Sequence, residues 1–148
     1  MKILLPILIL LTGVGTGIMV ACNSRLKDSL GSPAFTVAVA FAIGSAFLFA
    51  VAATGVSGKI TLASAGDTPW WAWAGGILSI IAVLVILIAN KESGSGALIL
   101  AASVVGQQAA ALASEHNGWL GTEKTPINGW KIAGFLLLVG GAVLMGKK

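Results

Sequence analysis

Few residues of this 148-residue chain could do chemistry, and the best pair stands where a long apolar run ends. Glu115 and His116 are adjacent there, an acid and a base expected close to membrane depth. Histidine changes its charge near neutral pH, and carboxylates in surroundings of low dielectric hold their protons more tightly. The pair therefore suggests a proton-sensitive gate. The alternative is a polar cap at the interfacial end of a helix.

The sequence lacks the groups of residues that form catalytic, metal-binding or phosphate-binding sites. It has one histidine, no clustered carboxylates, no metal-ligand spacing and no phosphate-binding loop, so we expect no enzyme, no metal site and no cofactor. The net charge of +4 lies in short polar segments and at the chain ends, without a basic stripe that contains aromatics. We therefore expect no nucleic-acid partner.

The composition indicates a membrane protein. Hydrophobic residues make up 57% of the chain and charged residues 9%, whereas soluble domains have roughly 45–50% and about 25%. A helix that spans a bilayer needs about 20 mostly apolar residues. We therefore expect an all-α integral membrane protein with the lipid bilayer around it, in which residues 1–148 form a single transmembrane domain. Its five helices are expected over residues 3–22, 34–56, 70–89, 96–114 and 129–145.

The first of these runs ends at Cys22 and has the outline of a lipoprotein signal. Signal cores are typically about 7–15 residues long, and this run is longer. We expect a retained helix.

Two of the expected helices carry a polar stripe. At about 100° per residue, Thr16 and Asn23 share one face of the first helix, and Ser103 and Gln107 share one face of the fourth. Polar groups within a membrane tend to face the bundle interior or a water-filled cavity. The stripes predict a shared, substrate-binding cavity. Hydrogen bonding between packed helices is the alternative.

The five tryptophans fall at the expected helix ends. This pattern is typical of an interfacial aromatic belt, which we expect for Trp70, Trp119 and Trp130. Trp71 or Trp73 could instead form an apolar wall of the substrate cavity.

Glycines line the last expected helix at Gly134, Gly140 and Gly141. Small residues let helix backbones approach closely in lipid. They predict a dimer seam through this helix, or else close packing within one subunit.

The basic residues of the short loops give almost no orientation signal. Four lie on the N-terminal side of the expected topology and five on the other: Lys2, Lys59, Lys124 and Lys131 against Arg25, Lys27, Lys91, Lys147 and Lys148. The balance predicts dual topology, in which two identical chains insert in opposite orientations and form an antiparallel homodimer.

Several short motifs, in this order and spacing, resemble the YdcZ-like family of the drug/metabolite transporter superfamily. They are Asn23-Ser24-Arg25-Leu26, Leu30-Gly31-Ser32-Pro33, Pro69-Trp70-Trp71-Ala72-Trp73, Gly106-Gln107 and Glu115-His116-Asn117-Gly118-Trp119. The resemblance implies an EamA-like half-size transporter of the bacterial inner membrane, with five helices per chain. Two units would form a ten-helix inverted repeat with the site at the repeat interface. The family usually has Asp before the histidine, where this chain has Glu115.

These observations together predict a secondary active transporter that moves a small metabolite or drug-like molecule by alternating access. The first helix contains no acidic residue, which argues against coupling through one buried carboxylate, as in the related four-helix multidrug transporters. The alternatives are a dual-topology ion channel and a membrane assembly subunit that transports nothing.

Overall fold

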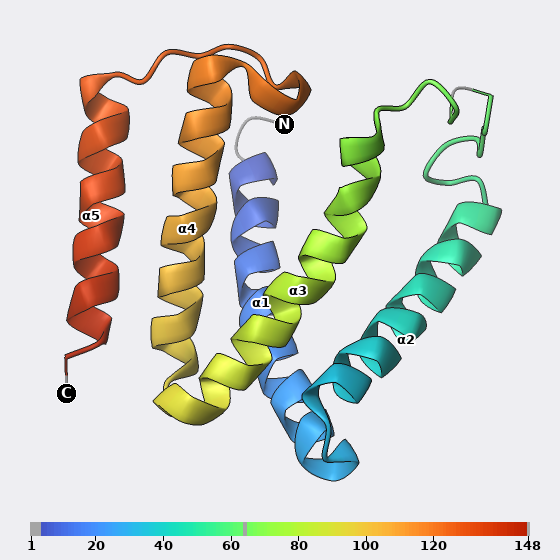
Figure 1. The fold of residues 1–148 in the computed structure, drawn as a ribbon, viewed down its shortest axis with the longest axis horizontal. Helices are drawn as coiled ribbons and strands as arrows, with labels where there is room; N and C mark the ends of the chain where they lie inside the picture. Colours follow the sequence, from blue (N-terminus) through green and yellow to red (C-terminus); the bar gives the residue numbers. More distant parts are fainter. Residues whose placement is uncertain (1–3, 64, 148) are drawn as a thin grey trace. The chain divides into compact units, whose positions relative to one another are not determined.

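The computed structural model describes residues 4–63 and 65–147, and throughout these ranges the only regular structure is helical. Five α-helices follow one another along the chain, with a short 3-10 turn, η1 (Trp119–Gly121), before the last (Figure 1). They are α1 (Leu4–Leu30), α2 (Pro33–Ala53), α3 (Trp70–Ser93), α4 (Gly96–Asn117) and α5 (Gly129–Met145). The described part of the chain thus confirms the all-α prediction and the number of helices.

The helices have the length and composition of membrane spans. Helices α1 to α4 are each long and apolar enough to cross a bilayer, whereas α5 is apolar but has only 17 residues. At about 1.5 Å per residue, α5 is roughly 26 Å long, just short of a hydrocarbon core of about 30 Å. The 27 residues of α1 exceed that thickness, reaching roughly 40 Å.

The largest difference from the sequence-based boundaries is at the end of α1. The sequence predicts an end at Cys22, but the helix continues through the polar segment to Leu30. Polar residues end the apolar stretch without breaking the backbone hydrogen bonds. The helix stops only at Gly31, whose φ of +74° is readily accessible to glycine and whose N–H donates to the Lys27 carbonyl at 2.8 Å.

The difference between apolar composition and backbone conformation also explains the other changes in helix boundaries. Helices α3 and α4 extend beyond their apolar stretches to Ser93 and Asn117, while α5 has the expected bounds. Helix α2 begins at Pro33, capped by the Ser32 hydroxyl, which accepts from Phe35 N–H at 3.3 Å. It ends at Ala53, before the expected Val56, and is followed closely by a left-handed glycine at position 55.

The chain divides into two compact units. We call residues 18–91 the central unit, and residues 1–17 with 92–148 the terminal unit, each taken over its described residues. The buried core residues all lie in the central unit: Val20, Thr36, Val37 and Leu87. In the terminal unit, α4 and α5 lie side by side (Figure 1).

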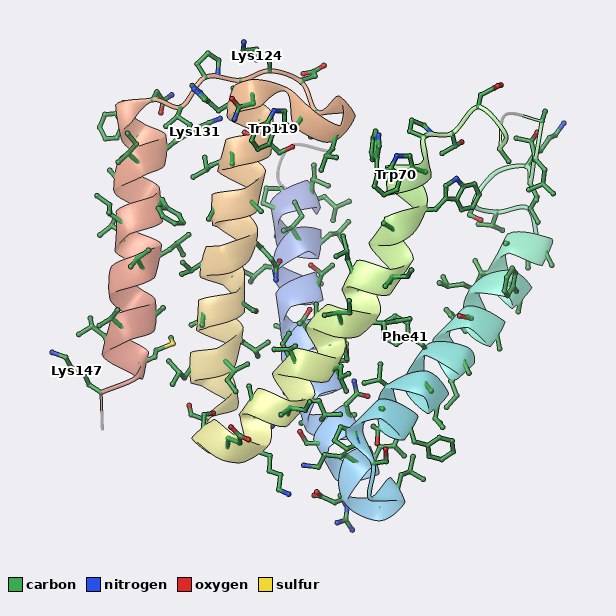
Figure 2. All side chains as sticks on the ribbon, viewed as in Figure 1. Phe41, Trp70, Trp119, Lys124, Lys131 and Lys147 are labelled. Carbon is green, nitrogen blue, oxygen red and sulfur yellow. The ribbon has the colours of Figure 1, made fainter. Side chains whose placement is uncertain are left out.

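Large apolar side chains are exposed on every helix. Phe49 of α2 is 76% exposed, and Leu137 of α5 is 77% exposed. Figure 2 shows such side chains along the whole length of the helices. In a bilayer these groups would meet lipid tails, so their exposure carries no penalty there.

Candidate functional site

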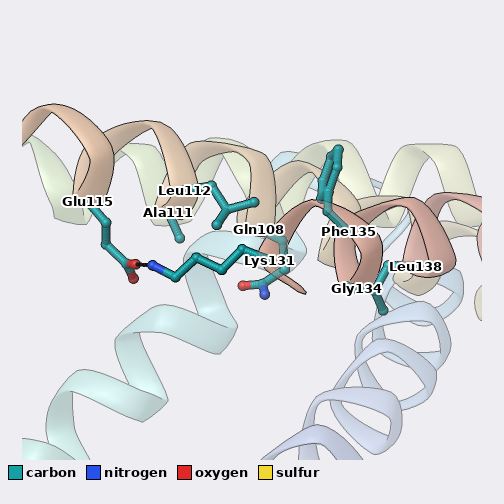
Figure 3. A pocket seen from close by; sticks show the side chains of 8 residues that line it. All are labelled: Gln108, Ala111, Leu112, Glu115, Lys131, Gly134, Phe135 and Leu138. Carbon is teal, nitrogen blue, oxygen red and sulfur yellow. Dashed lines mark hydrogen bonds and ion pairs between the residues drawn. The ribbon is translucent and has the colours of Figure 1, made fainter. Parts of the chain in front are cut away.

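A cleft of about 340 Å³ lies between α4 and α5 in the terminal unit (Figure 3). On each helix the lining residues follow the spacing i, i+3, i+4, i+7, which places them on one helix face. Helix α4 contributes Gln108, Ala111, Leu112 and Glu115, and helix α5 contributes Lys131, Gly134, Phe135 and Leu138. The volume is at the lower end of the range of ligand pockets, roughly 300–1,000 Å³.

An ion pair joins the two walls of this α4–α5 cleft. Lys131 Nζ lies 2.9 Å from Glu115 Oε2, and the two side chains reach toward each other from opposite helices (Figure 3). The Lys131 side chain is 27% exposed and that of Glu115 is 42% exposed. A pair this accessible contributes only about 0–1 kcal/mol to stability. It does give the cleft two opposite charges with little net charge.

Helix ends position both partners. Lys131 is in the first turn of α5, where its N–H donates to the side-chain oxygen of the N-cap Asn128 at 2.9 Å. Glu115 lies in the last turn of α4, and its carbonyl accepts from Thr125 N–H at 2.8 Å. These bonds place the ion pair at the end of the cleft next to the loop that joins α4 to α5.

That loop, residues 118–128, is hydrogen-bonded to the last turn of α4. The Thr122 hydroxyl lies 3.0 Å from the Ser114 carbonyl and 2.8 Å from the Trp119 carbonyl. Ile127 N–H donates to His116 Nδ1 at 3.3 Å. Together with the bond from Thr125 N–H to the Glu115 carbonyl, these contacts hold the loop against the end of α4.

Glu115 and His116, predicted together as a gate, thus have different surroundings. Glu115 lines the cleft and pairs with Lys131, whereas His116 is not among the lining residues and accepts from the loop backbone. Adjacent residues on a helix are about 100° apart, which explains the separation. The gate stays a prediction.

The remaining lining residues make the cleft amphipathic. Gln108 offers an amide donor and acceptor, while Leu112, Phe135 and Leu138 are apolar. At Gly134 an added Cβ would have no atom within 4 Å, so the cleft is open there. An ion pair, an amide and apolar groups together suit a small molecule that has both charged and apolar parts.

Three residues predicted to line a cavity lie elsewhere in the terminal unit. The Thr16 hydroxyl donates to the Thr12 carbonyl, and the Ser103 hydroxyl to the Leu100 carbonyl, each at 2.9 Å. Gln107 is exposed. None of the three lines the α4–α5 cleft.

Asn23, in the central unit, lies at a tight helix contact. It lines a narrow crevice between α1 and α3 together with residues that include the buried Val20 and Leu87. Next to it, Asn90 Nδ2 donates to the Ser24 hydroxyl at 2.9 Å. This neighbourhood is typical of packing between helices, one of the two interpretations open from sequence.

The two candidate wall tryptophans differ at the hollow beside the start of α3. Trp73 borders a space of about 390 Å³ formed mainly by the loop between α2 and α3, whereas Trp71 does not border it. Trp70 lies at the start of α3, and Trp119 lies in the loop after α4 (Figure 2). These are the positions expected of an interfacial belt.

The three α5 glycines fall into two groups. Gly134 lines the cleft within one chain. An added Cβ at Gly140 or Gly141 would meet nothing within 4 Å, so their surface is uncovered in the single chain. A dimer seam at these two positions stays a prediction.

Sequence reasoning missed Gln108, Lys131 and Phe135 as site residues. Lys131 was counted only as a charge flanking the membrane, although its spacing from Gly134, Phe135 and Leu138 marks one helix face. The alignment of α4 with α5 depends on the conformation of residues 118–128. That conformation decides which α5 residue lies opposite Glu115.

Comparison with known proteins gives a match at the level of the family. A family model described as "Putative inner membrane exporter, YdcZ" matches residues 4–144 of the chain. This range contains the whole of the α4–α5 cleft and all the described helices except the last residue of α5. No curated protein and no solved structure matches the chain.

Proposed function

Because this chain belongs to the YdcZ family of inner-membrane exporters, we propose that it is a secondary active transporter working as an antiparallel homodimer. It is a multi-pass protein of the inner membrane, and its family is one of transporters, not of enzymes. The proposed cargo is a small metabolite or drug-like molecule. The proposed dimer would contain ten helices related by an inverted repeat.

The lining of the α4–α5 cleft is the structural observation that best supports the proposal. The α4–α5 cleft offers charged, amide and apolar groups on facing walls of two apolar helices. Ligand sites of this kind hold small molecules through a few polar groups in otherwise apolar surroundings. In a family of exporters, such a cleft is the natural candidate for the substrate.

The charge distribution supports the antiparallel dimer. In a topology in which the five helices alternate across the membrane, Lys59, Lys124 and Lys131 would fall on one side and Arg25, Lys27 and Lys91 on the other. With the chain ends included, the tally is four against five. So small a difference gives no preferred orientation.

An inverted pair provides a route for transport. In transporters built from inverted repeats, one half rocks against the other around a site near the membrane midplane. Polar residues of the predicted central cavity, Thr16, Asn23, Ser103 and Gln107, would contribute to that route in the dimer. Trp71 or Trp73 would form its apolar wall, and Glu115 with His116 its gate.

Flux in proteoliposomes tests the transport function. We expect saturable uptake that an internal pool of the same solute accelerates by counterflow. Very high unitary flux without counterflow would instead indicate the dual-topology channel. Stable association with another membrane protein and no flux would indicate an assembly subunit.

A reporter fused to the C-terminus tests the orientation in cells. Dual topology predicts signal on both sides of the membrane. Signal from one side only would contradict the homodimer and require a separate, oppositely oriented homologue.

Two adjacent glutamines test which site is used. Gln108 lines the α4–α5 cleft, whereas Gln107 belongs to the predicted central cavity. If the substrate binds in the cleft, Gln108→Ala reduces flux more strongly than Gln107→Ala. If the substrate binds in the predicted central cavity, Gln107→Ala has the larger effect.

A further inference from the structure

We propose that the α4–α5 cleft selects a zwitterion, a small molecule with one ammonium and one carboxylate group on a compact apolar body. This inference rests on the proposed function and names the substrate class of the same site. It follows from the charges, their separation and the shape of the cleft.

The two charges of the cleft already compensate each other. Glu115 Oε2 and Lys131 Nζ are 2.9 Å apart on opposite walls, each partly shielded from solvent. A ligand with a single charge would pair with one partner and leave the other without a counterion. Such an exchange forms one ion pair for the one that it breaks, so a single charge gains nothing from the pairing.

A zwitterion compensates both partners at once. Its ammonium would pair with Glu115 and its carboxylate with Lys131, and the net charge of the cleft would not change. Two charge-assisted contacts thus form in place of the one that opens. The ion pair thereby acts as a filter that favours ligands carrying both signs.

The shape of the cleft suggests where the rest of the ligand lies. Gln108 is two helical turns from Glu115 on α4, or about 10 Å along the axis. Between the charged end and Gln108, the walls include Leu112 and Phe135, and Gly134 leaves room for an apolar group. A volume of about 340 Å³, at ~30 Å³ per water, holds a molecule of roughly a dozen non-hydrogen atoms.

Three probes with the same phenylethyl body test the proposal. L-Phenylalanine carries both charges, phenethylamine only the positive one, and 3-phenylpropionate only the negative one. Binding to the purified full-length protein is measured as a concentration-dependent rise in melting temperature. We expect L-phenylalanine to bind on the order of tenfold more tightly than either analogue. Equal binding of the three, or no binding of L-phenylalanine, would overturn the proposal.

Removing one charge should redirect the selectivity. Glu115→Gln leaves Lys131 free to pair, so this variant should prefer 3-phenylpropionate and lose about tenfold in affinity for L-phenylalanine. Lys131→Gln should prefer phenethylamine. The matched controls Glu123→Gln and Lys147→Gln change charges outside the cleft and should keep the wild-type order.

The exchanged pair Glu115→Lys/Lys131→Glu guards against a loss of folding in the single variants. It keeps two opposite charges, and both charged groups of an α-amino acid are on the same carbon. A small rotation of the ligand would restore both contacts, so this variant should still prefer the zwitterion. Unchanged selectivity in the folded single variants, or a lost zwitterion preference in a folded exchanged variant, would contradict the proposal.

Counterflow in proteoliposomes separates this inference from the proposed function. Saturable flux of another solute without zwitterion preference would overturn the substrate class and leave the transporter intact. Zwitterion binding without flux of any probe would support the site and contradict transport.

Discussion

Two contacts between helices contain a polar side-chain pair, and they differ in almost every other respect. In the central unit, Asn90 and Ser24 join α3 to α1 beside the buried Val20 and Leu87. In the terminal unit, Glu115 and Lys131 join α4 to α5 at the end of an open cleft. The first contact is neutral and closely packed, and the second is charged and hollow.

The difference shows which polar groups are available to a ligand. A neutral pair within a closely packed contact has its hydrogen bond made and offers no space beside it. The ion pair lies next to about 340 Å³ of open volume, so a ligand that entered the cleft would reach both charges. The polarity of the residues does not distinguish a structural contact from a site open to a ligand. The packing of the side chains beside each pair does.

The largest expected effect concerns packing at the closed contact. Leu87 is 2% exposed, so Leu87→Ala should lower the free energy of unfolding by about 2–5 kcal/mol through the cavity it leaves. Leu138→Ala, at a cleft residue that is 40% exposed, should cost far less. Reversible unfolding in mixed micelles measures both. Equal losses would mean that the two contacts are packed alike.

Filling the open cleft should affect transport more than stability. Gly134→Leu places a side chain where an added Cβ meets no atom within 4 Å, so it should fold while reducing flux by at least about tenfold, or ~1.4 kcal/mol. Gly75→Leu, at an equally open position on α3, is the control. Cross-linking should show that both variants still form dimers. Wild-type flux in Gly134→Leu would argue against the cleft as the substrate site.

The third prediction concerns the neutral pair of Asn90 and Ser24, for which we expect a moderate coupling free energy. Asn90→Ala should lower the free energy of unfolding by about 1 kcal/mol, because it removes a 2.9 Å hydrogen bond to the Ser24 hydroxyl. A double-mutant cycle with Ser24→Ala isolates the pair, and the same cycle on Glu115 and Lys131 should give only about 0.2–1 kcal/mol. Flux should be unchanged in Asn90→Ala. A strong loss of flux with wild-type stability would give this contact a direct role in transport.

The smallest effect is expected at His116. His116→Ala removes the acceptor for Ile127 N–H and should lower the free energy of unfolding by about 0.5 kcal/mol. Residues 118–128 should then open more often from the end of α4. His116→Asn places a side-chain acceptor near the position of Nδ1 and cannot be protonated near neutral pH. Amide hydrogen exchange at Ile127 should rise in the alanine variant and stay near wild type in the asparagine variant. If flux depends on pH through this residue, His116→Asn should abolish that dependence.

Much of the fold could be predicted because hydropathy and helix signals are local. The apolar runs were expected to begin at Gly96 and Gly129, and α4 and α5 begin there, where Ser95 and Asn128 cap them. The end of α1 was misplaced by eight residues, because apolar composition marks membrane depth and not backbone conformation.

The candidate site was less predictable. Glu115 and Gly134 were singled out from sequence, but as parts of a gate and of a dimer seam. Gln107 was selected by its polar stripe, whereas its neighbour Gln108 faces the cleft. A helical stripe shows which residues share a face and does not show which other helix that face meets.

The sequence by itself determined a five-helix membrane protein, the near balance of basic residues and the resemblance to a transporter family. These properties follow from composition, local capping and the order of motifs along the chain. Only the tertiary structure decided that Lys131 pairs with Glu115 and that an open cleft lies beside them. That pairing depends on how residues 118–128 fold against the last turn of α4, which sets the alignment of two helices. No periodicity within either helix contains this information.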